Sequence, residues 1–223
     1  MLIKLLRLSL AALPLLLAAC TTPPERLPYL GERDVRANPN GGPADTIFAS
    51  APAFRLVNQD GKRFGNTDFA GHLYLTDFFF ATCPGICPKM QGELLKIYKE
   101  HAGDERIKFI SFTIDPAHDT VEVLRTYAQK LGVADARQWQ FATFVTANRD
   151  SVFALSKAYF TAAQPETGAP GGFAHSGTLA LMDDQGHIRG LYDSLNKDQM
   201  LKLRHDLPLL LAELAERYPS TKK

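Results

Sequence analysis

The sequence carries almost no net charge. Its 223 residues contain 25 Lys and Arg against 24 Asp and Glu, which gives a formal net charge of +1 at pH 7. No stripe of basic residues stands out along the chain, and a near-neutral surface offers no basis for binding nucleic acid. Internal repeats are also absent. We therefore expect one globular domain with no nucleic-acid partner.

Long apolar runs are equally scarce. The one clear run covers residues 8–18, follows Lys4 and Arg7, and ends in Leu17-Ala18-Ala19-Cys20. A basic region, an apolar stretch and small residues before a cysteine are typical of a secretory signal with a bacterial lipobox, in which the cysteine becomes the lipidated first residue. An uncleaved membrane anchor is the alternative, but the run is shorter than the roughly 20 residues that a spanning helix needs.

This interpretation places the rest of the chain outside the cytoplasm. We assign residues 1–19 to a lipoprotein signal peptide, 20–45 to a membrane tether and 46–223 to the folded domain. The protein is then a membrane-anchored lipoprotein on the periplasmic side, lipidated at Cys20. Residues 21–45 are rich in proline and glycine, which suits a spacer; alternatively, this segment wraps loosely over the fold.

Cysteine is the third scarce feature, with three in the chain. If Cys20 carries lipid, the remainder is Cys83 and Cys87. In an oxidising compartment such a pair is a structural disulfide, a redox couple or a metal site.

The pattern of apolar residues predicts an α/β domain. A hairpin signal at Asp60-Gly61 comes first. The further elements, in chain order, are a strand at 72–80, a helix at 89–101, a strand at 107–114, a helix at 119–131, a strand at 139–145, a helix at 148–160, a hairpin of strands 178–182 and 188–192, and a helix at 196–217. This order matches a thioredoxin-like fold, with a mixed central sheet flanked by helices and an N-terminal hairpin extension.

The two cysteines stand four residues apart, where a strand passes into a helix. In helical geometry their Cβ atoms lie about 5–6 Å apart, wider than the roughly 3.8 Å that a disulfide prefers. This spacing suits two thiolates that converge on one metal ion, although Pro84 and Gly85 make a distorted, disulfide-forming turn easier. The helix N-terminus favours the thiolate form, and soft thiolates select Cu(I) over hard cations. A purely structural disulfide across so short a loop would contribute little stability.

Three stretches resemble the Sco/SenC family. Residues 83–88, Cys-Pro-Gly-Ile-Cys-Pro after an aromatic-rich strand, resemble its CPxxCP signature. Residues 111–120, which contain Asp115-Pro116 and Asp119-Thr120, are similar to its DP-x-x-DT segment, and residues 173–176 to its histidine segment. Together the resemblance covers roughly residues 50–195.

The resemblance implies a copper ion, Cu(I) or Cu(II), bound by Cys83, Cys87 and His175, and a redox-active disulfide between the two cysteines. It also implies a copper chaperone that delivers copper to, or reduces, the CuA site of cytochrome oxidase subunit II, with a periplasmic copper donor or thiol reductant as a further partner. His175 follows a loop at 161–174 rich in Gly, Pro and Ala, from which it could swing towards the cysteines. Gly85 and Ala174 stand where many members carry an acidic residue. The chain therefore has less negative charge near the site, but all three ligands are present.

Other polar residues receive more ordinary interpretations. Asp115 and Asp119 are taken as a DP turn and a helix N-cap rather than an acid–base pair. Asp77 either faces inward, where it would tune the cysteine pKa values, or is solvated. Five further histidines are expected to be surface or core residues: His72, His101, His118, His187 and His205.

Three alternative functions remain open. The first is a thiol-disulfide oxidoreductase that acts on protein cysteines, so whether the chain is an enzyme stays undecided. A peroxiredoxin-like peroxidase would want an Arg beside its reactive cysteine, and the sequence near Cys83 has none. A zinc site of two Cys and one His would leave one coordination position open, as in catalytic zinc sites.

Overall fold

The computed structural model describes residues 25–144, 149–161 and 163–219. The proposed signal peptide, residues 1–19, and the proposed lipidation site, Cys20, lie outside the described residues. Within the described part of the chain, no helix is both long and apolar enough to cross a membrane.

Eleven strands and four α-helices make up this part of the chain. The strands are β1 (Arg33–Arg36), β2 (Asp45–Phe48), β3 (Arg55–Asn58), β4 (Arg63–Gly65), β5 (Leu73–Phe79), β6 (Ile107–Thr113), β7 (Trp139–Thr143), β8 (Ala163–Pro165), β9 (Phe173–His175), β10 (Thr178–Met182) and β11 (Ile188–Asp193). The helices are α1 (Ile86–Glu100), α2 (Val121–Leu131), α3 (Arg149–Ala158) and α4 (Lys197–Arg217), with short 3-10 turns at Asn66–Asp68 and Pro170–Gly172.

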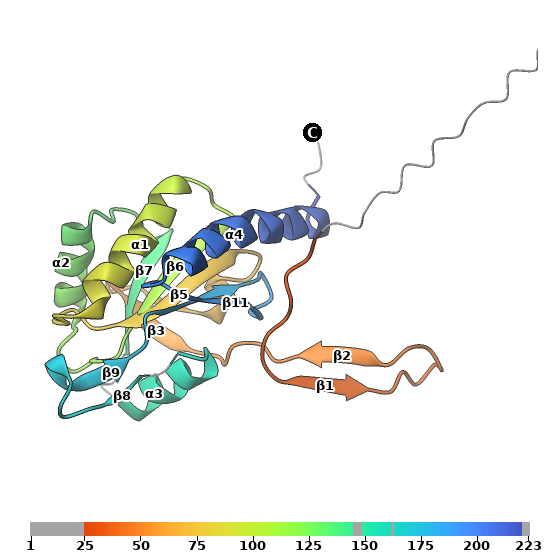
Figure 1. Ribbon diagram of the computed structural model, residues 1–223, viewed down its shortest axis with the longest axis horizontal. Helices are drawn as coiled ribbons and strands as arrows, with labels where there is room; N and C mark the ends of the chain where they lie inside the picture. Colours follow the sequence, from red (N-terminus) through yellow and green to blue (C-terminus); the bar gives the residue numbers. More distant parts are fainter. Residues whose placement is uncertain (1–24, 145–148, 162, 220–223) are drawn as a thin grey trace, which may run out of the picture.

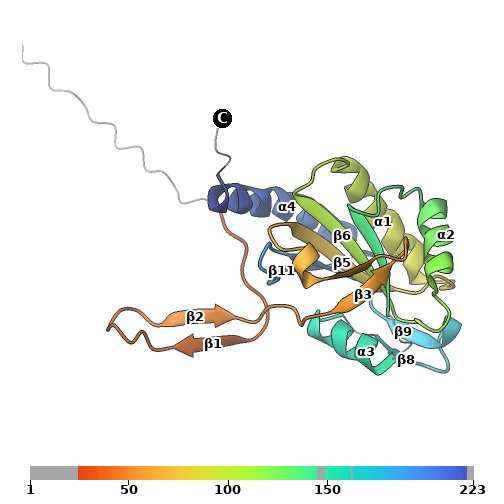
Figure 2. The same ribbon diagram turned by 180° about the vertical axis from the view of Figure 1, so that it is seen from behind.

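Seven of these strands form one mixed sheet in the order β11-β10-β5-β6-β7-β3-β4. The three central strands β5, β6 and β7 are parallel, and the outer strands pair antiparallel with them and with each other. Helices α1, α2 and α4 lie over one face, whereas α3 and the small β8–β9 hairpin lie below the other (Figures 1 and 2). This architecture confirms the prediction of an α/β domain with a mixed central sheet.

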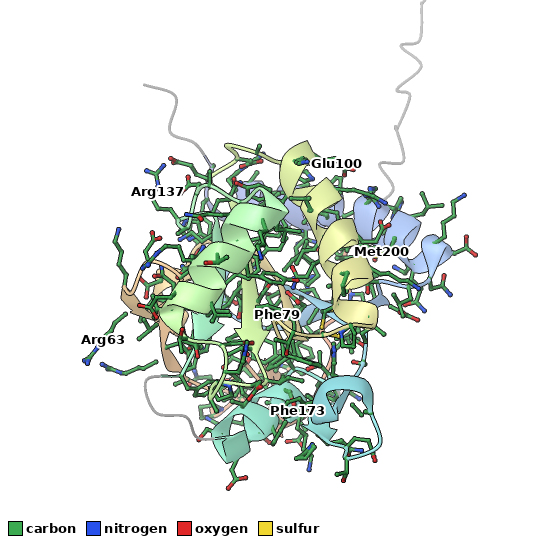
Figure 3. The ribbon with its side chains drawn as sticks, turned by 90° about the vertical axis from the view of Figure 1, so that its left-hand side faces the viewer. Arg63, Phe79, Glu100, Arg137, Phe173 and Met200 are labelled. Atoms are coloured by element: carbon green, nitrogen blue, oxygen red, sulfur yellow. The ribbon has the colours of Figure 1, made fainter. Side chains whose placement is uncertain are left out.

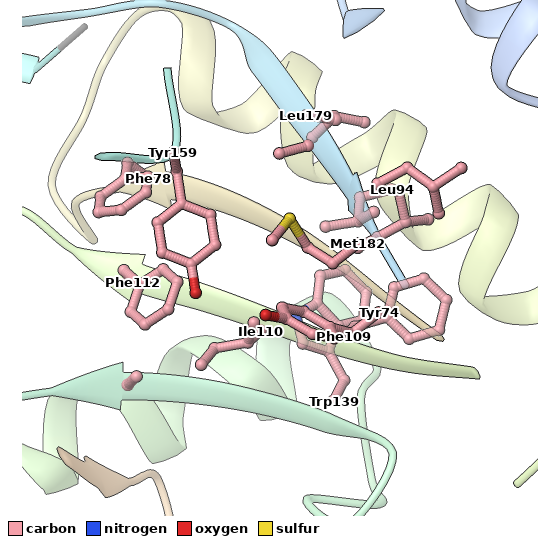
Figure 4. Close-up of a cluster of buried hydrophobic side chains, with 14 of the residues drawn as sticks. Tyr74, Phe78, Leu94, Phe109, Ile110, Phe112, Trp139, Tyr159, Leu179 and Met182 are labelled. Atoms are coloured by element: carbon pink, nitrogen blue, oxygen red, sulfur yellow. The ribbon is translucent and has the colours of Figure 1, made fainter. Parts of the chain in front are cut away.

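The central strands are covered on both faces. All seven residues of β5 are buried, as are six of the seven in β6, which is the usual state of parallel strands between helical layers. Figure 4 shows the aromatic cluster that results, with Phe78, Phe112 and Tyr159 at one end and Trp139 beside Phe109. Seen from the end near β9, Phe79 lies at the centre, and charged side chains such as Arg63, Glu100 and Arg137 lie at the periphery (Figure 3).

The segment before β1 packs against the domain. Leu27 is buried, and the backbone of Leu30 bridges to Ile188 at the start of β11. The buried guanidinium of Arg189 donates to the carbonyl oxygens of Leu27 and Pro28. Residues 21–45 are expected from the sequence either to form a spacer or to wrap over the fold, and residues 27–30 wrap over it. Strands β1 and β2, which follow, form an exposed hairpin (Figure 1).

Three local predictions need correction. Helix α1 begins at Ile86 rather than at 89, because the first-turn N–H groups have no intrahelical acceptor and Pro88 can occupy that turn. The N-cap of α2 is Thr120, whose side chain accepts from the amide of Val123, and not Asp119. Most of the loop expected at 161–174 is occupied by β8, a 3-10 turn and β9, which pair as a hairpin.

Candidate metal site at the end of the central strand

The two cysteines occupy different structural settings. Cys83 lies in the turn between β5 and α1, is partly exposed, and donates its amide N–H to the carbonyl oxygen of Phe80 (3.1 Å). Cys87 lies in the first turn of α1, and only 1% of it is exposed. Both are free cysteines. The local sequence explains this arrangement, since Gly85 serves as the N-cap and α1 starts one residue before Cys87 rather than two residues after it.

His175 lies between the two sulfur atoms and the backbone. Its Nε2 is 3.1 Å from the Cys87 sulfur and 3.8 Å from the Cys83 sulfur. Its Nδ1 is 3.2 Å from the carbonyl oxygen of Ser176. If Nδ1 carries the proton and donates it to this carbonyl, Nε2 keeps its lone pair for the sulfur side. The donor atoms of the three side chains all lie within 4.8 Å of one another.

Aromatic packing holds His175 in this place. Phe80, the residue after β5, meets the imidazole edge-on, with 5.7 Å between ring centroids, and also packs against Phe173 of β9. Gly171 lies close to the same ring. A side chain at position 171 would bring its Cβ atom within 2.5 Å of the Phe80 ring, so only glycine fits there without a shift. The sequence predicts that His175 reaches the cysteines from a mobile loop. In the structure a packed hairpin, β8 and β9, holds His175 beside them.

Burial sets the protonation of the site. It raises the pKa of the Cys87 thiol well above the usual range, and the neighbouring Cys83 sulfur adds to the effect. Burial, the largest cause of this raised pKa, therefore works against the thiolate form that the helix N-terminus is expected to favour at Cys87. Burial also lowers the pKa of His175, which keeps its imidazole neutral and able to ligate.

Asp119 connects the cysteine turn to the next strand. Its carboxylate is fully buried and accepts the amide N–H of Ala81 (3.0 Å) and the hydroxyl of Thr113. Its other oxygen is 2.9 Å from Nδ1 of His118, and this contact raises the pKa of His118. The sequence predicts a helix cap for Asp119, and the structure gives that place to Thr120. The DP-x-x-DT spacing marked the segment, but no local signal could show that it reaches back to Ala81.

Asp77 is the second buried carboxyl near the site, and of its two expected positions it takes the inward one. It accepts the hydroxyl of Ser111 (2.5 Å) and the amide of Gln91 on α1 (2.6 Å), and Trp139 donates to the same hydroxyl (3.0 Å). Burial raises the pKa of Asp77 to about 7. Its charge in turn contributes to the raised pKa of the Cys87 thiol.

A hollow of about 570 Å³ lies beside the cysteine turn, between α1 and α2. Thr82 of the turn and Pro88 of α1 line it, together with His118 and the α2 side chains Val123 and Tyr127. A polypeptide that approaches Cys83 therefore has an open, largely apolar surface next to it.

The other candidate histidines lie outside the cysteine–histidine cluster. His187 and His205 pair with Asp183 and Asp206, and His72 contacts a nearby backbone carbonyl. In the described part of the chain, the one group of three His, Cys, Asp or Glu side chains close enough to hold a metal ion is the cysteine–histidine cluster. Two thiols and one neutral imidazole are soft to borderline donors, a set that fits copper or zinc and not Mg²⁺ or Ca²⁺.

Comparison with known sequences agrees with this geometry. Residues 44–205 match the family model SCO1/SenC. A Stutzerimonas stutzeri protein described as copper-binding is 30% identical over 145 residues, which cover 62% of this chain and 67% of that protein. The SCO1 protein homolog of Bacillus subtilis is 30% identical over 123 residues, which cover 55% of this chain and 63%, less than two thirds, of its own length.

Solved structures show the same fold. A SCO1/SenC family lipoprotein from Bacillus anthracis superposes with a TM-score of 0.65 at 26% identity, covering 73% of this chain and 95% of that one. BsSco, a member of the Sco family of cytochrome c oxidase assembly proteins, gives a TM-score of 0.58 at 22% identity, covering 70% and 92%. The fold is therefore the thioredoxin-like fold of the Sco proteins, and the chain belongs to the SCO1/SenC family.

Proposed function

We propose that this protein is a copper chaperone that carries one copper ion on Cys83, Cys87 and His175. The observation that carries the proposal is the convergence of three donor atoms within 4.8 Å of one another. Thiolate and imidazole donors suit Cu(I), and imidazole also suits Cu(II). The copper-binding description of the Stutzerimonas stutzeri relative supports the choice of copper over zinc.

The proposed recipient is the CuA site of cytochrome oxidase subunit II, which the chaperone loads with copper or reduces. Membership of the SCO1/SenC family supports this target, because BsSco belongs to a family of cytochrome c oxidase assembly proteins. We further propose that the chain is exported, lipidated at Cys20 and held on the periplasmic side of a membrane. There a copper donor loads it with copper, or a thiol reductant reduces its cysteines. The Bacillus anthracis structure is likewise that of a lipoprotein.

Thiol-disulfide exchange is the second candidate function. The observation that favours it is the unequal exposure of the pair, since Cys83 is partly exposed and Cys87 is buried behind it. In such an exchange the Cys83 thiolate would attack a partner disulfide and form a mixed disulfide. Cys87 would then attack Cys83, which leaves the pair oxidised and both partner sulfurs reduced.

Copper titration of the reduced chain tests the first proposal. We expect one copper per chain, and His175→Ala should weaken binding at least about 100-fold, because loss of a ligand exceeds the 10- to 100-fold cost of losing a ligand's hydrogen-bond partner. His187→Ala is the matched control, since this histidine is similarly enclosed but pairs with Asp183. Both variants should still form the disulfide between Cys83 and Cys87, which alkylation and mass spectrometry detect. Unchanged copper retention in His175→Ala would refute the three-ligand site.

A further inference from the structure

Asp119 joins three elements at the cysteine end of the sheet. One carboxylate oxygen accepts from the amide of Ala81, before the cysteine turn, and from the hydroxyl of Thr113, at the end of β6. The other faces Nδ1 of His118, ahead of α2. The carboxylate is 0% exposed. A buried carboxylate with all of these contacts is held firmly, and it holds its partners equally firmly.

The two cysteines depend on this contact to different degrees. Cys87 lies within the first turn of α1 and is 1% exposed. Cys83 lies in no helix or strand, and its turn is entered through Ala81, two residues earlier. The Cys83 sulfur is also the farther of the two from Nε2 of His175, at 3.8 Å against 3.1 Å. A small movement of this turn would therefore alter the Cys83 position first.

We propose that Asp119 is a positioning residue of the metal site. By accepting the amide N–H of Ala81, it fixes the turn that carries Cys83 and so sets the distance between the Cys83 sulfur and Nε2 of His175. This inference rests on the proposed copper-binding function and assigns to Asp119 a role beyond starting α2. Its hydrogen bonds go to Ala81, Thr113 and His118 rather than to either cysteine sulfur or to His175, so it acts through the backbone.

Two substitutions of Asp119 separate this role from a general loss of charge. Asp119→Asn can keep its carbonyl oxygen towards Ala81 and Thr113 and turn its NH₂ group towards His118. The imidazole can then accept at Nδ1 in its other neutral tautomer. Asp119→Ala has no acceptor at all and leaves the Ala81 N–H without its partner. Positioning therefore predicts that the asparagine variant rescues the site and that the alanine variant does not.

The matched control is Asp206, which sits in the same local arrangement away from the cysteines. It is 3% exposed, its carboxylate is 3.1 Å from Nδ1 of the adjacent His205, and it accepts the hydroxyl of Tyr192 at 2.7 Å. Asp206→Ala also deprives buried groups of an acceptor. It should lower the melting temperature without touching the copper site.

The experiment uses the full chain in detergent, reduced and metal-free. Competition against a Cu(I) chelator gives the affinity, and the thiolate-to-copper absorption band of the Cu(II) complex reports the ligand geometry. Asp119→Ala should bind copper about 10- to 100-fold more weakly, the usual cost of losing a group that orients a ligand, and should shift the band. The copper affinity of Asp119→Asn should stay within about threefold of that of wild type. The affinity of Asp206→Ala should equal that of wild type.

Each outcome decides the inference. Wild-type affinity and an unshifted band in Asp119→Ala would overturn it, as would an equal loss in Asp206→Ala. If Asp119→Ala does not fold, replacement of Ala81 by lactic acid removes the N–H donor and also weakens the Phe80 carbonyl, which accepts from Cys83; affinity should fall at least as far as in Asp119→Ala, and unchanged binding there would also overturn the inference. A wild-type chain that binds no copper overturns the proposed function, and this inference with it.

Discussion

Replacing Asp77 by asparagine should remove the contribution that Asp77 makes to the pH dependence of stability between about pH 4 and 7. Asp77 is fully buried, and burial raises its pKa from 3.8 to about 7. In that interval the folded state holds a proton that the unfolded chain has released. The contribution of Asp77 to stability is therefore greatest below pH 4, falls as pH rises, and reaches its lower level above pH 7.

The difference between 3.8 and about 7 corresponds to about 4 kcal/mol. Asparagine has the shape of the carboxyl group but no charge to desolvate. Its carbonyl can accept from Ser111. The amide of Gln91, whose Nε2–H now donates to Asp77, can turn over so that its unpartnered Oε1 accepts from the new NH₂. Asp77→Asn should thus equal wild type near pH 4 and exceed it at pH 8 by up to about 4 kcal/mol.

Urea unfolding of the reduced, metal-free chain at pH 4.5, 6 and 8 measures this difference. The control is Asp206→Asn. Burial acts to raise the pKa of Asp206, but hydrogen bonds from Lys202, Tyr192 and His205 outweigh it and lower the pKa. The native carboxylate therefore stabilises the fold above about pH 4, and its loss should destabilise the chain at pH 7. Parallel stability curves for wild type and Asp77→Asn from pH 4.5 to 8 would refute the reasoning.

Two further substitutions test the supports of the fold and of the site. Arg189→Met leaves Glu213 buried without its bidentate partner; it should cost about 3–5 kcal/mol in urea unfolding and expose residues 27–30 to limited proteolysis, and wild-type protease resistance would contradict this. Gly171→Ala forces a Cβ towards the ring of Phe80 at a φ of +84°, so His175 should shift and copper affinity should fall about tenfold. Gly41→Ala, at a φ of +77° with nothing within 4 Å, is the matched control, and equal affinities of the two variants would exclude steric displacement.

The sheet and the cysteine pair could be predicted because their signals are local. The aromatic-rich strand β5 and the apolar strand β6 show their burial in consecutive residues. The spacing of the pair placed Cys83 and Cys87 at the junction of a strand and a helix. Element ends were less accurate, as at Ile86, because a proline in the first helical turn does not mark where the helix begins.

What the sequence could not supply are quantities that depend on depth and on distant contacts. The raised pKa of Cys87 follows from the layers that cover it, whereas its position at a helix start predicts the opposite. The contact of Asp119 with Ala81 spans 38 residues of sequence. The hairpin that carries His175 packs against Phe80 at Gly171; the sequence places Phe80 in the aromatic-rich strand and Gly171 in the following Gly-rich loop, but neither signal shows that the two residues meet.

The two ends of the domain have separate tasks under the proposed function. The cysteines follow the carboxyl end of β5, while the start of this strand pairs with the end of β10, beside Ile188 and the packed segment 27–30. Figure 1 shows that segment near the end of α4, with β9 and α2 at the opposite end. Between Cys20 and Arg26, which pairs with Glu216 on α4, the chain can span only about 20 Å. A lipid on Cys20 would therefore hold the α4 end near the membrane and direct the metal site away from it, towards partners that extend from the surface.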